Sequence, residues 1–167
     1  MIERIQDPAL VKMLATHPAI LPYISDDWTR KPEEWDAPVN DSIVYLVASD
    51  AGISFGFGAF VPQTWTCYQA HLGFLPSSYG DVAITAFKEM LGWMWANSTA
   101  ARLVGEICQE NRRAIAFAKR AGFEEYGINQ KSFLRGGVLR DQVCLGISKP
   151  GDFATGTFAT GIRLVKP

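Results

Sequence analysis

A strand that passes almost directly into a short capped helix is the feature of this sequence that most constrains its fold. Residues 101–108, ARLVGEIC, have the apolar and β-branched composition of a buried strand. Soon after it, Asn111 is a strong N-cap for a helix whose end is marked by Gly122, a residue suited to the left-handed conformation. Phe123 is then expected to pack back on Phe117. The stretch predicts a β–α unit and therefore a sheet covered by helices.

Helix and strand signals alternate through the rest of the chain. Asp7-Pro8 and the motif HPAILPYIS mark two short helices, and Asp81 is expected to cap a third helix that runs to Asn97. The predicted fold class is α/β, or α+β, with a mixed sheet flanked by helices. The expected strands are 43–48, 53–60, 64–74 and 101–108, followed by a hairpin over 124–148 that turns on Arg135-Gly136-Gly137.

The charges are divided unevenly along the chain. Residues 1–87 hold 4 Lys and Arg against 10 Asp and Glu, whereas residues 88–167 hold 12 against 7. Either two solvated faces differ in sign, or a cleft has one acidic and one basic wall, which suits a cationic acceptor and an anionic cofactor. Only half of the chain offers a basic surface, so specific nucleic-acid binding is not expected.

Length and composition indicate one soluble domain. The 167 residues are 48% hydrophobic and 20% charged, which is ordinary for a globular protein. The weakly charged stretch 51–80 is interrupted by Gly, Pro and polar residues, so no membrane span is expected, and the N-terminus has no signal-peptide pattern. Cys67, Cys108 and Cys144 stand singly, as buried thiols do, without the spacing of a metal site. A cytoplasmic protein without a metal is expected.

The C-terminal residues stand apart from this domain. Residues 1–149 make up the predicted domain, and 150–167 form a tail in which the Phe-Ala-Thr-Gly sequence at Phe153 recurs at Phe158. A disordered end and an extended arm both fit this pattern, and the alternation of small and aromatic residues favours the arm. We therefore expect assembly through the tail, either into a homo-oligomer or onto another protein.

The element order, with LVGEICQENRRAIAFAKRAGFEEYG at its centre, resembles the GNAT superfamily of acetyl-coenzyme-A-dependent N-acetyltransferases. The resemblance covers residues 1–148 and is most specific where a strand runs into Asn-x-x-Ala, a helix and Gly-Phe, here Asn111, Ala114, Gly122 and Phe123. It implies a GNAT-like, mostly antiparallel sheet whose two central parallel strands splay apart.

Two further segments are similar to particular members of that superfamily. The hairpin sequence GGVLRDQVCLGI is similar to that of ribosomal-protein-type members, with Gly137 and Asp141 at the familiar places. The short length, HPAILPYIS and AHLGFLPSSYG resemble small GNAT-like proteins encoded by bacteriophages. This second likeness raises the alternative of a virion-associated protein.

The resemblance implies that acetyl-CoA is a co-substrate bound where the strands 64–74 and 101–108 splay. The pantetheine arm would lie along one strand, and the pyrophosphate would lie at the loop 78–83 before the next helix. Asn111, which follows the second of these strands, would contact the cofactor from that side. The implied cofactor-binding residues are Phe74, Leu75, Tyr79, Gly80, Asp81, Val82, Ala83, Asn111 and Arg112.

The sequence departs from the family pattern at two places. In the phosphate loop, Val82 stands where a glycine is usual and Tyr79 where a Gln or Arg is usual, so a β-branched side chain is expected where backbone must approach phosphate. Asp81 adds a negative charge, with no Lys or Arg between Lys31 and Lys88 to offset it. The tyrosine that protonates the leaving thiolate in many members is replaced by Ala118.

A general base is needed to take the proton from an attacking amine, and two strand residues are candidates. His71 lies on the predicted third strand, although a hydrogen-bonded sheet residue explains it equally. Glu106 lies on the fourth strand, and in the alternative interpretation it simply faces solvent. These two residues form the predicted catalytic set.

Two functions follow as hypotheses. The first is acetyl transfer from acetyl-CoA to a primary amine, on a small molecule or a protein, by direct attack in a ternary complex. In that case the polar loop around Trp28 and Trp35 would shape a site for a cationic acceptor. The second is a non-catalytic GNAT-like structural or accessory protein, which Val82, Asp81 and Ala118 favour.

Overall fold

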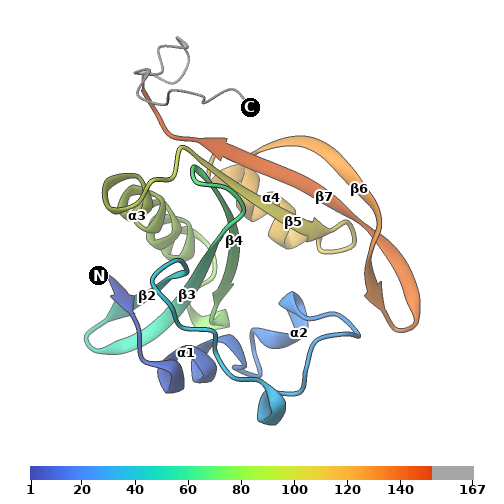
Figure 1. Ribbon diagram of the computed structural model, residues 1–167, viewed down its shortest axis with the longest axis horizontal. Helices are drawn as coiled ribbons and strands as arrows, with labels where there is room; N and C mark the ends of the chain where they lie inside the picture. Colours follow the sequence, from blue (N-terminus) through green and yellow to red (C-terminus); the bar gives the residue numbers. More distant parts are fainter. Residues whose placement is uncertain (152–167) are drawn as a thin grey trace, which may run out of the picture.

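The chain folds around a single seven-stranded sheet, which a computed structural model describes for residues 1–151 (Figure 1). The strands lie in the order β1-β2-β3-β4-β5-β7-β6. They are β1 (Ile2–Ile5), β2 (Val44–Asp50), β3 (Ile53–Pro62), β4 (Cys67–Phe74), β5 (Arg102–Cys108), β6 (Glu124–Arg135) and β7 (Val138–Ser148). The helices are α1 (Pro8–Ala15), α2 (Leu21–Ile24), α3 (Asp81–Asn97) and α4 (Arg112–Arg120), with single 3₁₀ turns at Pro32–Glu34 and Pro76–Ser78.

The central strands β4 and β5 are parallel and diverge, as predicted. Every other strand pair is antiparallel, and β4 pairs with β5 only from Cys67–Arg102 to Gln69–Val104. Beyond Gln69 the edge of β4 that faces β5 has no strand partner within residues 1–151. The sheet therefore opens into a V, visible in Figure 1 as the gap between β4 and β5.

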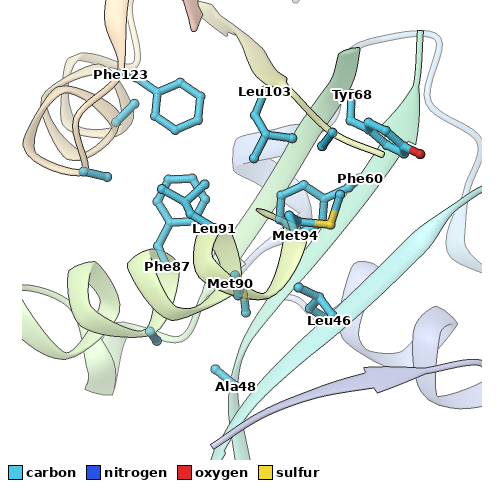
Figure 2. Packing of buried hydrophobic residues seen from close by; sticks show 14 of the residues in the cluster. Leu46, Ala48, Phe60, Tyr68, Phe87, Met90, Leu91, Met94, Leu103 and Phe123 are labelled. Atoms are coloured by element: carbon cyan, nitrogen blue, oxygen red, sulfur yellow. The ribbon is translucent and has the colours of Figure 1, made fainter. Parts of the chain in front are cut away.

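The main core lies between α3 and one face of the sheet. The buried side of α3 carries Phe87, Met90 and Met94, which face Phe60 and other apolar strand residues (Figure 2). Burying each such side chain stabilises the fold by about 1.5–3 kcal/mol. A smaller cluster covers the opposite face, where Val11 and other residues of α1 pack on β2 and β3. The molecule thus has helices on both faces of the sheet.

The helix α4 has the local structure that its sequence predicts. The side chain of Asn111 accepts a hydrogen bond from the backbone N–H of Ala114 at 3.1 Å. At the other end Gly122 has φ 103°, and the N–H of Phe123 donates to the carbonyl of Ala118 at 3.0 Å. The rings of Phe123 and Phe117 both stack on Phe87 of α3, at 5.6 and 5.7 Å between centroids. The aromatic contact therefore fastens α4 to the main core.

The structure differs from the expectations at the start of α3, at the N-terminus and in the loop that carries the two tryptophans. Gly80, with φ 93°, is the N-cap of α3, and Asp81 is its first residue and makes no capping bond. The strand β1 is additional to the predicted elements: it pairs antiparallel with β2 from Ile2–Ala48 to Ile5–Tyr45, and Ile5 is its one buried residue. Trp35 packs in the cluster beneath α1, so it anchors its loop to the core, whereas Trp28 is 82% exposed. Of the predicted tail 150–167, residues 152–167 lie outside the described residues.

Candidate active site

A cleft of about 920 Å³ occupies the space that the diverging strands leave open. Its walls include residues of β4 and β5, the first turns of α3 and α4, and the segment around α2. Because β4 and β5 separate, the cleft reaches from the helix termini on one face of the sheet to polar side chains on the other. One continuous space therefore joins two chemically different ends.

One end of the cleft is positively charged and lies against α4. Arg112, Arg113 and Arg120 line it together with Tyr79 and Gly80 of the predicted phosphate loop. The first-turn N–H groups of a helix favour an anion, and arginine suits phosphate oxygens. This end therefore has the chemistry of an anion site.

The ion pair between Arg120 and Asp81 corrects the expectation that the charge of Asp81 is not offset. The Nη2 atom of Arg120 lies 2.7 Å from Oδ1 of Asp81, and both side chains are well exposed. The pair cannot be predicted from local sequence because the two residues are 39 positions apart.

Most of the predicted cofactor-binding residues come together, but three do not line the cleft. Val82 is 55% exposed and lies outside it. Contrary to the expectation, its side chain therefore does not narrow the space for phosphate. Leu75 lines a separate small cavity, its N–H donates to the carbonyl of Phe55, and its carbonyl accepts from Ser78. Both backbone groups of Leu75 are thus already bonded. Asp81 is the third, and the predicted residues that do line the cleft are Phe74, Tyr79, Gly80, Ala83, Asn111 and Arg112.

The two predicted catalytic residues lie at the other end and on the same face of the sheet. His71 and Glu106 each follow by two positions the last paired residues of their strands, Gln69 and Val104, so both side chains point to one side. Both line the cleft. The side-chain amide of Asn129 donates to Glu106 at 3.4 Å.

The surroundings of His71 favour its neutral form. Solvent reaches the ring through the cleft, yet the protein atoms around it partly desolvate it, which lowers the pKa of His71 below 6.5. The negative charge of Glu106 raises the same pKa by a smaller amount. A neutral imidazole at pH 7 is free to accept a proton.

Nothing in the sequence indicates that α2 belongs to this end. Tyr23, Ile24, Asp26 and Thr29 line the cleft from the α2 segment. Glu110 also lines it, but its carboxylate is paired with Arg140 at 2.8 Å. HPAILPYIS predicts a short helix, and nothing local in that motif indicates which strand it will cover.

Known proteins resemble the chain in structure rather than in sequence. No family model and no curated sequence matches it. A spermidine N-acetyltransferase from Vibrio cholerae, solved with CoA and spermine, superposes with a TM-score of 0.72 at 15% identity, over 89% of this chain and 94% of that one. The ribosomal-protein-S5-alanine acetyltransferase from Vibrio fischeri gives 0.67 at 14%, over 88% and 91%. A GNAT-family acetyltransferase from Streptococcus pneumoniae gives 0.66 at 13%, over 89% and 98%.

The chain has the GNAT fold. The predicted fold class is thereby confirmed, and the likeness to bacteriophage proteins stays a prediction. Within this fold, Ala118 lines the cleft as a buried residue of α4, so no tyrosine hydroxyl is present at that position.

Two further expectations concern membranes and metals. None of the helices within residues 1–151 has the length and apolar character needed to cross a bilayer. Over the same residues, no group of three or more His, Cys, Asp or Glu side chains is arranged to hold a metal ion.

Proposed function

We propose that this chain is an N-acetyltransferase that moves the acetyl group of acetyl-CoA to a primary amine by direct attack in a ternary complex. The observation that carries the proposal is the divergence of β4 and β5, which opens one cleft between an arginine-rich end and His71 with Glu106. Such a cleft lets a thioester enter from one face and an amine from the other.

The cofactor would occupy the arginine-rich end. Its pantetheine arm would bond to the free edge of β4 beyond Gln69, as an added strand does. The pyrophosphate would lie near Tyr79 and Gly80, where Arg112 supplies positive charge. The side chain of Asn111 already caps α4, so its amide group is held at the wall of the cleft.

The chemistry requires one proton acceptor and one leaving group. The reacting amine nitrogen, in its unprotonated form, attacks the thioester carbonyl carbon and forms the new C–N bond, and neutral His71 accepts the one proton that this nitrogen then loses. The C–S bond then breaks and the electron pair leaves on sulfur. A thiol has a pKa of about 8.5, so the thiolate can depart without an acid at the position of Ala118.

The acceptor would be a cationic amine. Asp26 and Glu106 line the acceptor end, and neither makes an ion pair with a Lys or Arg among residues 1–151. Tyr23 and Phe133 add aromatic faces, which also favour a cation. The Vibrio cholerae enzyme of the same fold was solved with spermine, which supports a polyamine-like acceptor.

A second candidate is a scaffold that has kept the fold without the reaction. Ala118 in place of an acid, and Asp81 beside the anion site, favour this alternative. Fold alone does not decide between the two.

Calorimetric titration of the protein with acetyl-CoA separates these functions. We expect micromolar binding, and an absence of heat at millimolar acetyl-CoA would support the scaffold. Thiol release is then measured with n-butylamine, 1,4-diaminobutane and glutamate. We expect 1,4-diaminobutane to be the best acceptor, and equal rates for the three amines would exclude a site selective for cations.

A further inference from the structure

The segment 20–29, which we call the strap, crosses the open side of the V and is attached at its two ends. It contains α2, and Figure 1 shows α2 between the lower ends of β4 and the β6–β7 hairpin. The helix has only four residues and none of them is buried. So short an element has little stability of its own, because most helical stability in proteins comes from packing. The position of the strap therefore depends on its attachments.

The first attachment is to β4. Ile20 is 3% exposed and lies directly on Gly73. A Cβ atom at Gly73 would collide with the Cγ2 methyl of Ile20, so the glycine is what lets the strap approach the strand.

The second attachment is to the turn of the β6–β7 hairpin. The carboxylate of Asp27 accepts hydrogen bonds from the N–H groups of Gly136, at 3.0 Å, and Gly137, at 2.8 Å. The two glycines have φ 60° and 72°, as a two-residue hairpin turn requires. The N–H of Asp27 also donates to the carbonyl of Leu134 at 2.9 Å.

An arginine of the hairpin strengthens this attachment. The Nη2 atom of Arg135 donates to the carbonyls of Pro22, at 3.1 Å, and Ser25, at 2.8 Å. Its guanidinium also lies 4.9 Å from the ring centroid of Phe133, which lines the cleft. The hairpin turn and the strap therefore bind each other through a charged group from each side.

We propose that Asp27 is a positioning residue for the acceptor: by binding the Gly136–Gly137 turn it holds the strap across the cleft and fixes Tyr23 and Asp26 beside His71 and Glu106. Asp27 does not line the cleft, so it acts through the strap and not by contact. The inference rests on the proposed function, because it takes the cleft end beneath the strap to be the acceptor end.

Two variants cut the attachment from opposite sides. Asp27→Asn removes the charge and turns a donor toward one of the glycine N–H groups, and Arg135→Ala removes the bonds to Pro22 and Ser25. Asp36→Asn is the matched control, because Asp36 is a fully exposed aspartate of the same loop with only a 3.7 Å contact to Lys12.

Hydrogen–deuterium exchange of the full chain tests the attachment without any ligand. We expect the amides of 21–29 and 136–137 to exchange about tenfold faster in both cutting variants, while α3 and the Asp36→Asn protein stay unchanged. Unchanged exchange in the cutting variants overturns the proposal.

Kinetics with 1,4-diaminobutane and calorimetry with acetyl-CoA test the positioning role. We expect KM for the amine to rise about tenfold while the Kd of acetyl-CoA stays within about twofold. Faster exchange with an unchanged KM, or KM and Kd rising together, overturns the proposal. A wild-type protein that acetylates none of the amines refutes the proposed function instead, and exchange alone then decides whether Asp27 holds the strap.

Discussion

At the cofactor end of the cleft, Phe74 and Phe117 pack on each other at 5.5 Å and belong to the main core, whereas at the acceptor end Tyr23 and Asp26 lie on a strap with one buried residue, Ile20. The cofactor wall is thus fixed by apolar burial. The acceptor wall is fixed by a few hydrogen bonds and one methyl contact. Substitutions in the first wall should lower global stability, while substitutions in the second should change local order and acceptor binding.

Replacing a core residue behind the cofactor wall should have the largest effect. Phe87 is 1% exposed and stacks on both Phe117 and Phe123, so Phe87→Ala leaves a cavity that loosens α4 as well as α3. We expect a loss of about 3–5 kcal/mol of unfolding free energy. Urea denaturation measures it, with Trp65→Ala as the control because Trp65 is 79% exposed. A loss below 1 kcal/mol would show that the two walls do not differ in this way.

Removing the candidate base should lower activity with little change in stability at pH 7. For His71→Gln we expect kcat to fall about 10²-fold. The folded pKa of His71 lies below 6.5, so the unfolded chain binds more protons as the pH falls below that value, and stability falls with it. The rate of the wild-type enzyme depends on neutral His71, so it should stay level down to about pH 6.5 and fall only in more acidic solution.

The pH profile also separates His71 from Glu106. Glu106→Gln removes a charge that raises the pKa of His71, so the acid limb of the profile should move to lower pH with the plateau rate largely kept. Loss of the plateau rate in this variant, with His71→Gln still active, would make Glu106 the base.

Filling the space at Gly73 should disturb the acceptor wall alone. Gly73→Ala pushes Ile20 away from β4, and we expect a cost of about 1–3 kcal/mol with faster hydrogen exchange over 20–29. Gly92→Ala is the matched control, since nothing lies within 4 Å of a Cβ at Gly92 in α3, and it should gain about 0.5–1 kcal/mol. Exchange that rises over α3 in Gly73→Ala would show that the two walls are coupled.

The smallest effect is expected at the exposed ion pair beside the anion site. Arg120→Ala leaves Asp81 without its partner and should weaken acetyl-CoA binding about fivefold, while Asp81→Asn should tighten it by a similar factor. Acetyl-pantetheine, which lacks the phosphates, should bind all variants equally. Val82→Gly is the control, because Val82 lies outside the cleft. Equal effects on both ligands would place the phosphates elsewhere.

The sequence by itself determined the elements whose energetics are local. Asn111 caps α4 through a bond to a residue three positions away, and Gly122 ends it through its own backbone conformation. The glycine pair at 136–137 turns the final hairpin for the same reason. Such features depend on neighbours within one helical or hairpin turn, so a pattern of residue types is enough to predict them. The splayed strands came from the family resemblance and were confirmed by the register of β4 and β5.

Only the tertiary structure decided how the two ends of the cleft are completed. The bond between Asp27 and Gly137 joins residues 110 positions apart, and that between Arg120 and Asp81 joins residues 39 apart. Leu75 is a further example, because its N–H donates a hydrogen bond to the carbonyl of Phe55 in β3. These contacts depend on how the sheet brings distant segments together, and a polar residue in a loop has the same local pattern whether or not it finds such a partner. The local sequence therefore does not indicate which residues of the strap belong to the site.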